Sequence, residues 1–162
     1  MRKLFIIAAM ALGLFAVGCD DDFTPPAQLS TSFYDTYPNA VDVEWEKKRG
    51  YVVAEFHIPG QGECEAWYTK GGEWVMTRYD IKFSDLPAAV QTAFVSEYGA
   101  QTPVDDVNRV DHNDGTTDYI LEVEVVVNGF LTDIFLYYEA DGTLMHTAAD
   151  IENYDYIYYY LD

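Results

Sequence analysis

Cys64 is the first residue of this chain to consider as a nucleophile, because His57 lies only one expected turn earlier. A catalytic thiol needs a lowered pKa, which a positive neighbour or the N-terminus of a helix supplies. Glu63 and Glu65 flank Cys64 and would raise the pKa of its thiol instead. The sequence therefore favours a buried, unreactive thiol. A thiol- or carboxylate-dependent hydrolase of the cell envelope is the alternative function.

Metal ligation is the second chemistry to consider. The three histidines show no paired spacing such as HExxH, so a zinc site is not expected. Residues 111–115, followed by Glu122, resemble a calcium loop. A calcium loop has a ligand at its fifth position and glycine at its sixth, whereas here Asp114 and Gly115 stand at the fourth and fifth positions. A hairpin turn explains this segment better. No phosphate-binding glycine loop and no G-x-S-x-G are found, so we expect no catalytic residue, no metal and no cofactor.

The charge balance limits the classes of partner that this protein could bind. The 162 residues include 9 Lys and Arg against 28 Asp and Glu, a net charge of −19, with 49% hydrophobic and 16% aromatic residues. A disordered acidic tail would be poor in aromatic residues, so the chain is expected to fold. Nucleic acid is excluded as a partner, because binding to phosphate backbones depends on clustered Lys and Arg.

The N-terminus carries an export signal. Arg2 and Lys3 precede an apolar run over residues 4–17 that is too short to span a membrane. The sequence Ala16-Val17-Gly18-Cys19 resembles a bacterial lipobox, which implies cleavage after residue 18 and a lipid on Cys19. Ordinary soluble secretion is the alternative. We expect a protein anchored by lipid to the bacterial outer membrane, either periplasmic or surface-exposed.

The residues after Cys19 form an acidic tether over residues 19–28. Asp20, Asp21 and Asp22 resemble the surface-export signal of lipoproteins in some Gram-negative groups, and a solvated acidic spacer is the alternative. Removal of Arg2 and Lys3 leaves 7 basic against 28 acidic residues, a mature charge of −21. Several acyl chains would hold even this polyanion on a membrane. After acylation of Cys19, Cys64 is the only free cysteine, so no internal disulfide is expected.

The mature chain repeats one plan. Helices are expected over residues 27–37 and 85–98, the second with Ser84 as N-cap and Gly99 as C-cap. Strands are expected at 41–47, 51–58, 63–69 and 73–80, and again at 104–111, 118–127, 130–138 and 143–149. Gly, Asn and Asp between these strands permit the positive φ of tight hairpins.

The two halves also match residue by residue. Phe33 and Tyr37 align with Phe94 and Tyr98 at an offset of 61. A duplication is the simplest interpretation. We expect an α+β protein with two tandem repeats of a helix packed on a four-stranded antiparallel sheet. The expected segments are a signal peptide at 1–18, the tether at 19–28, repeats at 29–83 and 84–151, and a Tyr-rich end at 152–162.

Several phrases of the sequence resemble the PepSY-like family of secreted or lipid-anchored bacterial proteins, also described as β-lactamase-inhibitor-like. They include Val43-Glu44-Trp45, Glu65-Ala66-Trp67-Tyr68, Gly72-Glu73-Trp74 and Ser84-Asp85-Leu86-Pro87. The similarity covers about residues 27–151. It implies tandem helix-and-four-strand units whose sheets lie side by side. It implies no catalytic residue.

Alternation along the strands indicates which side chains face away from the helices. One helix covers only one face of each sheet, and the apolar sets place Val52, Ala54 and Phe56 on the covered face. The opposite face is expected to be open and to bind a partner through rings and carboxylates, namely Tyr51, Glu55, Glu65, Trp67, Phe135 and Tyr137. Cross-strand aromatic pairs that only stabilise a solvated face are the alternative.

The C-terminal end is unusually rich in tyrosine. Tyr154, Tyr156, Tyr158 and Tyr160 share a period of two, which predicts an edge strand or a segment laid over aromatic surface. Packing within the same molecule and capture of a partner by strand addition are both open. Together these features predict a noncatalytic, membrane-tethered module that binds a protein or peptide. Inhibition of an enzyme is a special case of this function.

Overall fold

The computed structural model describes residues 23–149 and 156–161. The expected signal peptide, the lipid-attachment residue Cys19 and the first part of the tether therefore lie outside the described residues, as does the segment 150–155. Within the described ranges, no helix has the length and apolar character needed to cross a membrane.

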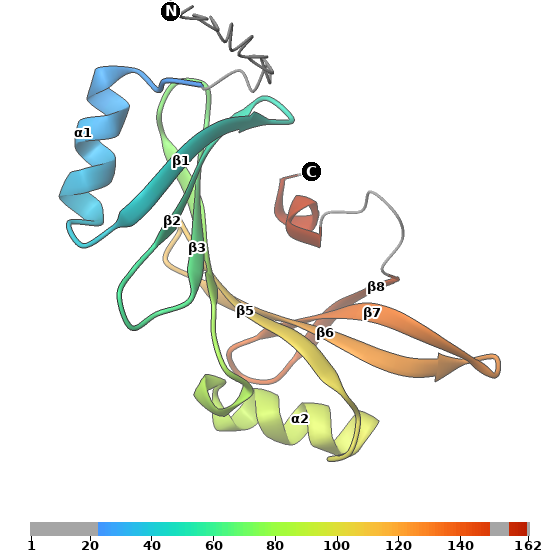
Figure 1. The fold of residues 1–162 in the computed structure, drawn as a ribbon. Coiled ribbons are helices and arrows are strands. Elements are labelled where there is room, and N and C mark those ends of the chain that lie inside the picture. The colour runs from blue at the N-terminus through green and yellow to red at the C-terminus, as the bar shows by residue number, and fades with distance from the viewer. Residues whose placement is uncertain (1–22, 150–155, 162) are drawn as a thin grey trace, which may run out of the picture.

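The elements follow the order helix, four strands, helix, four strands (Figure 1). The first half contains α1 Ala27–Thr36, β1 Val41–Lys48, β2 Tyr51–His57, β3 Glu63–Tyr68 and β4 Trp74–Asp80. The second half contains the 3-10 helix η1 Phe83–Asp85, α2 Ala88–Tyr98, β5 Val104–His112, β6 Thr117–Val127, β7 Phe130–Glu139 and β8 Leu144–Ala149, and the 3-10 helix η2 Tyr156–Tyr160 follows. Each end of the eight strands lies within one residue of its sequence prediction.

The start of the second helix differs from the prediction. Residues Phe83–Asp85 form the separate 3-10 helix η1, and α2 begins only at Ala88. Leu86, between them, is extended with φ −62° and ψ 149°. The ring of Pro87 explains this, because a proline disfavours helical geometry in the residue before it. The predicted C-cap is confirmed, since Gly99 follows the helix with a positive φ of 92°.

All eight strands form one antiparallel sheet in sequential order. Strand β4 pairs with β5, for example Arg78 with Val110 and Tyr79 with Arg109. The α+β class is confirmed, but the expected two four-stranded sheets are joined into one. The sheet is strongly curved, and both helices lie on its outer, convex side (Figure 1). The duplication itself stays a prediction.

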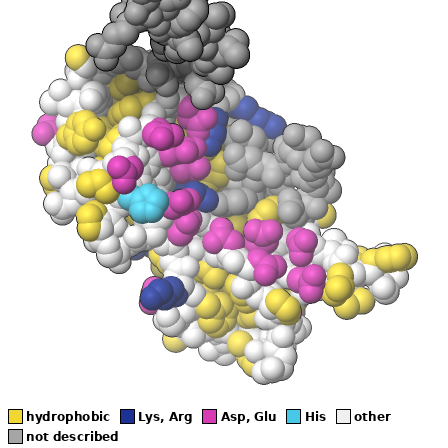
Figure 2. All heavy atoms as spheres, in the orientation of Figure 1, with side chains coloured by type: hydrophobic (Ala, Val, Ile, Leu, Met, Phe, Trp, Pro, Cys, Tyr) yellow, Lys and Arg dark blue, Asp and Glu magenta, His cyan; other side chains and the backbone are white. Residues whose placement is uncertain are grey.

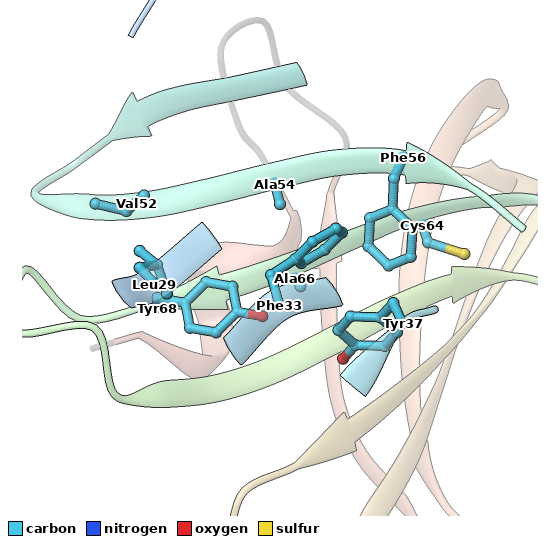
Figure 3. Packing of buried hydrophobic residues seen from close by; sticks show 9 residues of the cluster. All are labelled: Leu29, Phe33, Tyr37, Val52, Ala54, Phe56, Cys64, Ala66 and Tyr68. Atoms are coloured by element: carbon cyan, nitrogen blue, oxygen red, sulfur yellow. The ribbon is translucent and has the colours of Figure 1, made fainter. Parts of the chain in front are cut away.

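The first half packs its helix through aromatic rings. Leu29, Phe33 and Tyr37 of the α1 segment are buried against β2 and β3 (Figure 3). The ring of Phe33 meets Phe56 edge to face at 5.0 Å between centroids. Such pairs add about 0.5–1.5 kcal/mol beyond the area they bury. The hydroxyls of Tyr37 and Thr77 lie 2.6 Å apart, so the polar end of this ring has a buried partner.

The second half repeats this arrangement around α2. Val90 and Phe94 are buried against β6 and β7. The β7–β8 turn approaches the helix so closely that a Cβ on Gly142 would lie 2.7 Å from the backbone oxygen of Ala89. This close approach, together with a φ of +89°, explains why glycine occupies position 142.

The concave side of the sheet is covered in part by the C-terminal residues (Figure 1). The predicted edge strand is wrong, because Tyr156–Tyr160 form a 3-10 helix. The alternative prediction, a segment laid over aromatic surface, is confirmed for the described residues. Ile157 is fully buried in one cluster with Trp67 and Tyr137.

Candidate functional site

The strand phases predicted for the face opposite the helices are correct. Trp67, Phe135 and Tyr137 belong to the cluster on the concave side, whereas Ala66 and Leu136 belong to the helix-covered cores. The expected exposure of the three rings is wrong. Trp67 and Tyr137 are 0% exposed, and Phe135 is also buried. The binding role assigned to these rings stays a prediction, but they present no surface to a partner in this structure.

The C-terminal helix η2 explains part of this burial. Its Tyr159 ring lies 4.6 Å from the ring of Tyr137, and its Tyr160 ring lies 4.7 Å from the imidazole of His112, between centroids. The Tyr160 side chain is partly buried, but its hydroxyl is buried, and this burial raises the pKa of the hydroxyl. The aromatic half of the concave face is therefore an internal interface.

The other half of the concave face is acidic (Figure 2). Several cross-strand pairs place two acidic residues directly opposite each other, and three of them are Glu55 with Glu65, Asp106 with Glu122, and Glu124 with Asp133. We call these six residues the acidic band. It runs diagonally across the sheet from β2 to β7. Directly opposed like charges destabilise a sheet, so the band is costly unless cations compensate it.

At the β2 end of the band, basic residues provide this compensation. Lys48 lies 2.8 Å from a carboxylate oxygen of Glu55 and 3.6 Å from one of Glu65, and it also pairs with Glu46 at 2.6 Å. Arg78 lies 3.5 Å from Glu65. Burial raises the pKa of Glu46, whereas a hydrogen bond from Glu46 lowers the pKa of Glu55. The carboxyl of Glu46 therefore binds a proton more readily than the carboxyl of Glu55.

At the β7 end, the described residues provide no such compensation for Glu124 and Asp133. Within the residues that the structure describes, Glu124 and Asp133 make no ion pair. Asp106 accepts a hydrogen bond of 2.6 Å from the amide of Asn108, which carries no charge. Glu124 and Asp133 therefore have negative charge available for a partner.

The acidic band ends at an apolar hairpin tip. The described pairing of β6 with β5 ends at Val123, and that of β7 with β8 ends at Ile134, so the segment between them projects as a two-stranded hairpin (Figure 1). Phe130 and Leu131 are 75% and 67% exposed at its tip, beside the exposed Val126. We call Val126, Val127, Phe130 and Leu131 the hairpin tip. Sequence reasoning placed this turn but missed its exposure, which four apolar residues around Asn128-Gly129 could have indicated.

Cys64 is buried, as expected. Its side chain is 1% exposed within the α1 core, and burial, with the nearby charge of Asp80, raises the pKa of its thiol to about 11. His57 pairs with Glu63 in the strand register, so it lies on the face opposite that of Cys64. Thiol and imidazole therefore do not form a pair. Among the described residues, no group of three His, Cys, Asp or Glu side chains could hold a metal ion.

The fold agrees with the comparisons to known proteins. A model of the family described as PepSY-like, and proposed to be beta-lactamase-inhibitor-like, matches residues 50–146. The chain belongs to this PepSY-like family. The search of curated proteins gives no match.

Solved structures with the same fold come from several Bacteroides species. A DUF2874 family protein from Bacteroides ovatus is 30% identical, with a TM-score of 0.69 over 78% of this chain and 89% of its own. A BLIP-like protein from Bacteroides fragilis is 28% identical, with a TM-score of 0.69 over 84% and 96%. A protein from Bacteroides eggerthii described as a proposed periplasmic protein is 22% identical, with a TM-score of 0.70 over 78% and 90%, and shares the fold.

Proposed function

We propose that this protein is a noncatalytic binding module of the bacterial envelope that holds a cationic protein or peptide. The observation that carries the proposal is the acidic band, whose uncompensated end leads to the exposed hairpin tip. Apolar anchors beside complementary charges are typical of protein interfaces. The partner would place basic side chains against Glu124 and Asp133 and an apolar surface over Phe130.

The acidic band argues for function because it costs stability. Opposed like charges across a strand pair are destabilising, and a two-stranded hairpin gains little from its own packing. Exposed apolar side chains on such a hairpin are also a risk for aggregation. Natural proteins keep such destabilising features mainly at functional sites that require them.

The residues first expected to bind divide into three groups. Glu55 and Glu65 belong to the acidic band and, with the half-buried Tyr51, remain part of the proposed surface. Trp67 supports this surface from below, because its indole nitrogen donates a hydrogen bond of 3.2 Å to Glu65. Phe135 and Tyr137 lie under the C-terminal helix and contribute packing.

The proposed location is the outer membrane, with the lipid on Cys19 as anchor. The basic, apolar N-terminus and the lipobox-like sequence before Cys19 support export and lipidation. The description of the Bacteroides eggerthii protein as a proposed periplasmic protein is consistent with an envelope location. An enzyme of the envelope is one class of partner, and inhibition would then follow from binding. Titration of such an enzyme with this protein measures that effect directly.

Charge reversal on the band tests the proposal. The double variant Glu124→Lys/Asp133→Lys should lose partners that the wild-type protein captures from envelope extracts. Glu97→Lys serves as control, because Glu97 is an exposed acid on α2. Because Glu124 is half-buried and Asp133 is exposed, the double variant should still fold. Circular dichroism verifies that it does. Identical captured proteins for the wild type and the double variant would reject this surface.

A further inference from the structure

A hollow of about 800 Å³ lies at the end of the molecule where the described chain begins. Its walls come from the segment before α1, one side of α1, the β1–β2 turn and the β3–β4 turn. The lining residues used below are Phe23, Leu29, Ser32, Lys47, Val52 and Lys70.

The topology brings these segments together. In an antiparallel meander, the β1–β2 and β3–β4 turns lie at the same end of the sheet. Helix α1 crosses the sheet and begins at this end, so Phe23 and the following prolines complete the wall. The volume lies within the range of small-molecule sites, about 300–1,000 Å³.

The charge of the hollow is opposite to that of the protein. Among the described residues that line it, Lys47 and Lys70 are charged and none is Asp or Glu. Four of the seven basic residues of the mature chain, Lys47, Lys48, Arg49 and Lys70, lie in the two turns or next to them. In a chain with net charge −19, this gathering at one end favours an anionic ligand there.

Of the two lining lysines, Lys47 makes a side-chain contact at the hollow, and Lys70 lies next to the β1–β2 turn. The Nζ of Lys47 lies 4.2 Å from the centre of the Phe23 ring, a cation–π contact. Lys70 extends over Gly50, where an added Cβ would lie 3.5 Å from its Nζ. Lys48, by contrast, is engaged by Glu46 and Glu55. The lining also contains the apolar Phe23, Leu29 and Val52, beside the polar Thr24, Gln28 and Ser32.

We propose that this hollow binds one anionic membrane phospholipid. The phosphate would lie between Lys47 and Lys70, and the glycerol and upper acyl carbons would lie against Leu29 and Val52. An anionic head beside an apolar body satisfies both parts of the lining. None of the lining residues belongs to the acidic band, and the site goes beyond the proposed partner binding.

The position of the tether favours a membrane lipid over a soluble anion. Phe23 follows Cys19 by four residues, a reach of at most about 14 Å when extended. If Cys19 is lipidated as proposed, the hollow therefore lies close to the headgroup region. The acyl groups on Cys19 carry no charge and would not need the lysines, and inorganic phosphate would not need the apolar wall.

Short-chain lipids below their micelle concentration test the proposal with the mature chain from residue 20, which contains every described residue. Calorimetric titration should detect dihexanoyl-phosphatidylglycerol and much weaker binding of dihexanoyl-phosphatidylcholine or inorganic phosphate. Lys47→Gln and Lys70→Gln should each weaken the binding by about tenfold, a typical loss for one charged hydrogen bond. Lys82→Gln, at an exposed lysine outside the lining, should not.

A steric pair provides a second test that does not change charge. Ser32→Trp should fill the hollow and abolish lipid binding, whereas Thr31→Trp, on the same helix outside the lining, should not. Both positions are exposed, and thermal unfolding verifies that the variants fold. Equal binding of both lipids, or of phosphate alone, would overturn the proposal, as would unchanged affinity in the lysine and Ser32 variants.

A third experiment uses the acylated protein. It should bind vesicles of phosphatidylcholine with one-fifth phosphatidylglycerol in such a way that Lys70 becomes protected from amine-reactive reagents. Protection in pure phosphatidylcholine vesicles as well would mean that the protein's own acyl chains fill the hollow, which would overturn the proposal. These variants leave the acidic band intact, so failure here is distinguishable from failure of the proposed partner binding.

Discussion

The imidazole of His146 and the ring of Tyr159 stack at 4.7 Å with an angle of 5° between their planes. This contact joins strand β8 to the C-terminal helix, and Tyr159 continues it to Tyr137. The helix thus converts half of a concave face into core and leaves the acidic band and the hairpin tip for other contacts. The proposed binding surface is therefore smaller, more acidic and farther from the rings than alternation alone predicts.

The C-terminal helix should contribute to stability mainly through Ile157. Ile157→Ala should lower the free energy of unfolding by about 2–4 kcal/mol, as for other buried isoleucines. Tyr159→Ala should cost less, because this ring is partly exposed. Urea denaturation followed by circular dichroism measures both. A change below about 0.5 kcal/mol for Ile157→Ala would mean that the helix is not packed in solution.

Cys64 should be nearly unreactive in the folded protein. Because burial raises the pKa of its thiol to about 11, the thiolate fraction at pH 8 is roughly a hundredfold lower than in the unfolded chain. The colour reaction with a thiol-specific disulfide reagent should therefore be slow without urea and fast in urea. Rapid reaction of the native chain, or a hydrolytic activity lost on alkylation, would support the alternative of a thiol enzyme.

The protein should lose stability in alkaline solution. Burial raises the pKa of Tyr68 from 10.0 to about 12. The folded state therefore keeps this proton where the unfolded chain has lost it. Its contribution is fully present below pH 10 and is lost as the pH rises toward 12, by at most about 2–3 kcal/mol.

Urea midpoints measured between pH 9 and 11.5 test this dependence. The pKa values of Tyr37 and Tyr138 are also raised by burial, so they add to the decline. Tyr68→Phe removes one titrating group and should make the decline shallower. A midpoint that stays constant over this range would contradict the burial of these hydroxyls.

Lys48 should stabilise the β2 end of the acidic band. Lys48→Met should lower the free energy of unfolding by about 1–3 kcal/mol at pH 7, because Glu46, Glu55 and Glu65 lose their shared cation. The loss should shrink near pH 4, where carboxylates become protonated. Lys82→Met, at an exposed site, serves as the matched control. Equal effects of the two substitutions would show that Lys48 compensates nothing.

Much of the fold could be predicted from the sequence because its signals are local. Glycines and asparagines between the strands set the strand ends, and Gly99 set the end of the second helix. The phase of Trp67 and Tyr137 followed from alternation. The predicted start of α2 was wrong because Pro87 disfavours helical geometry in the residue before it. The prediction gave more weight to the helical spacing of the apolar residues than to this local effect.

Long-range relationships could not be predicted in this way. The joining of β4 to β5 depends on a pairing across a connection that includes a whole helix. The cover over Trp67 depends on residues that lie about ninety positions later in the chain. A period of two in the tyrosines indicated a strand. Ile157 interrupts this pattern, and in the structure it is buried in the concave cluster while the segment forms a 3-10 helix.

Site-specific photo-cross-linking in intact cells tests the central claim most directly. A photoreactive phenylalanine analogue replaces Phe130 at the hairpin tip or Glu124 in the acidic band, with Val95 on α2 as an exposed control. We predict one and the same basic protein adduct from Phe130 and Glu124, reduced at high salt, and none from Val95. No adduct from the first two positions, or the same adducts from all three, would contradict binding through this surface.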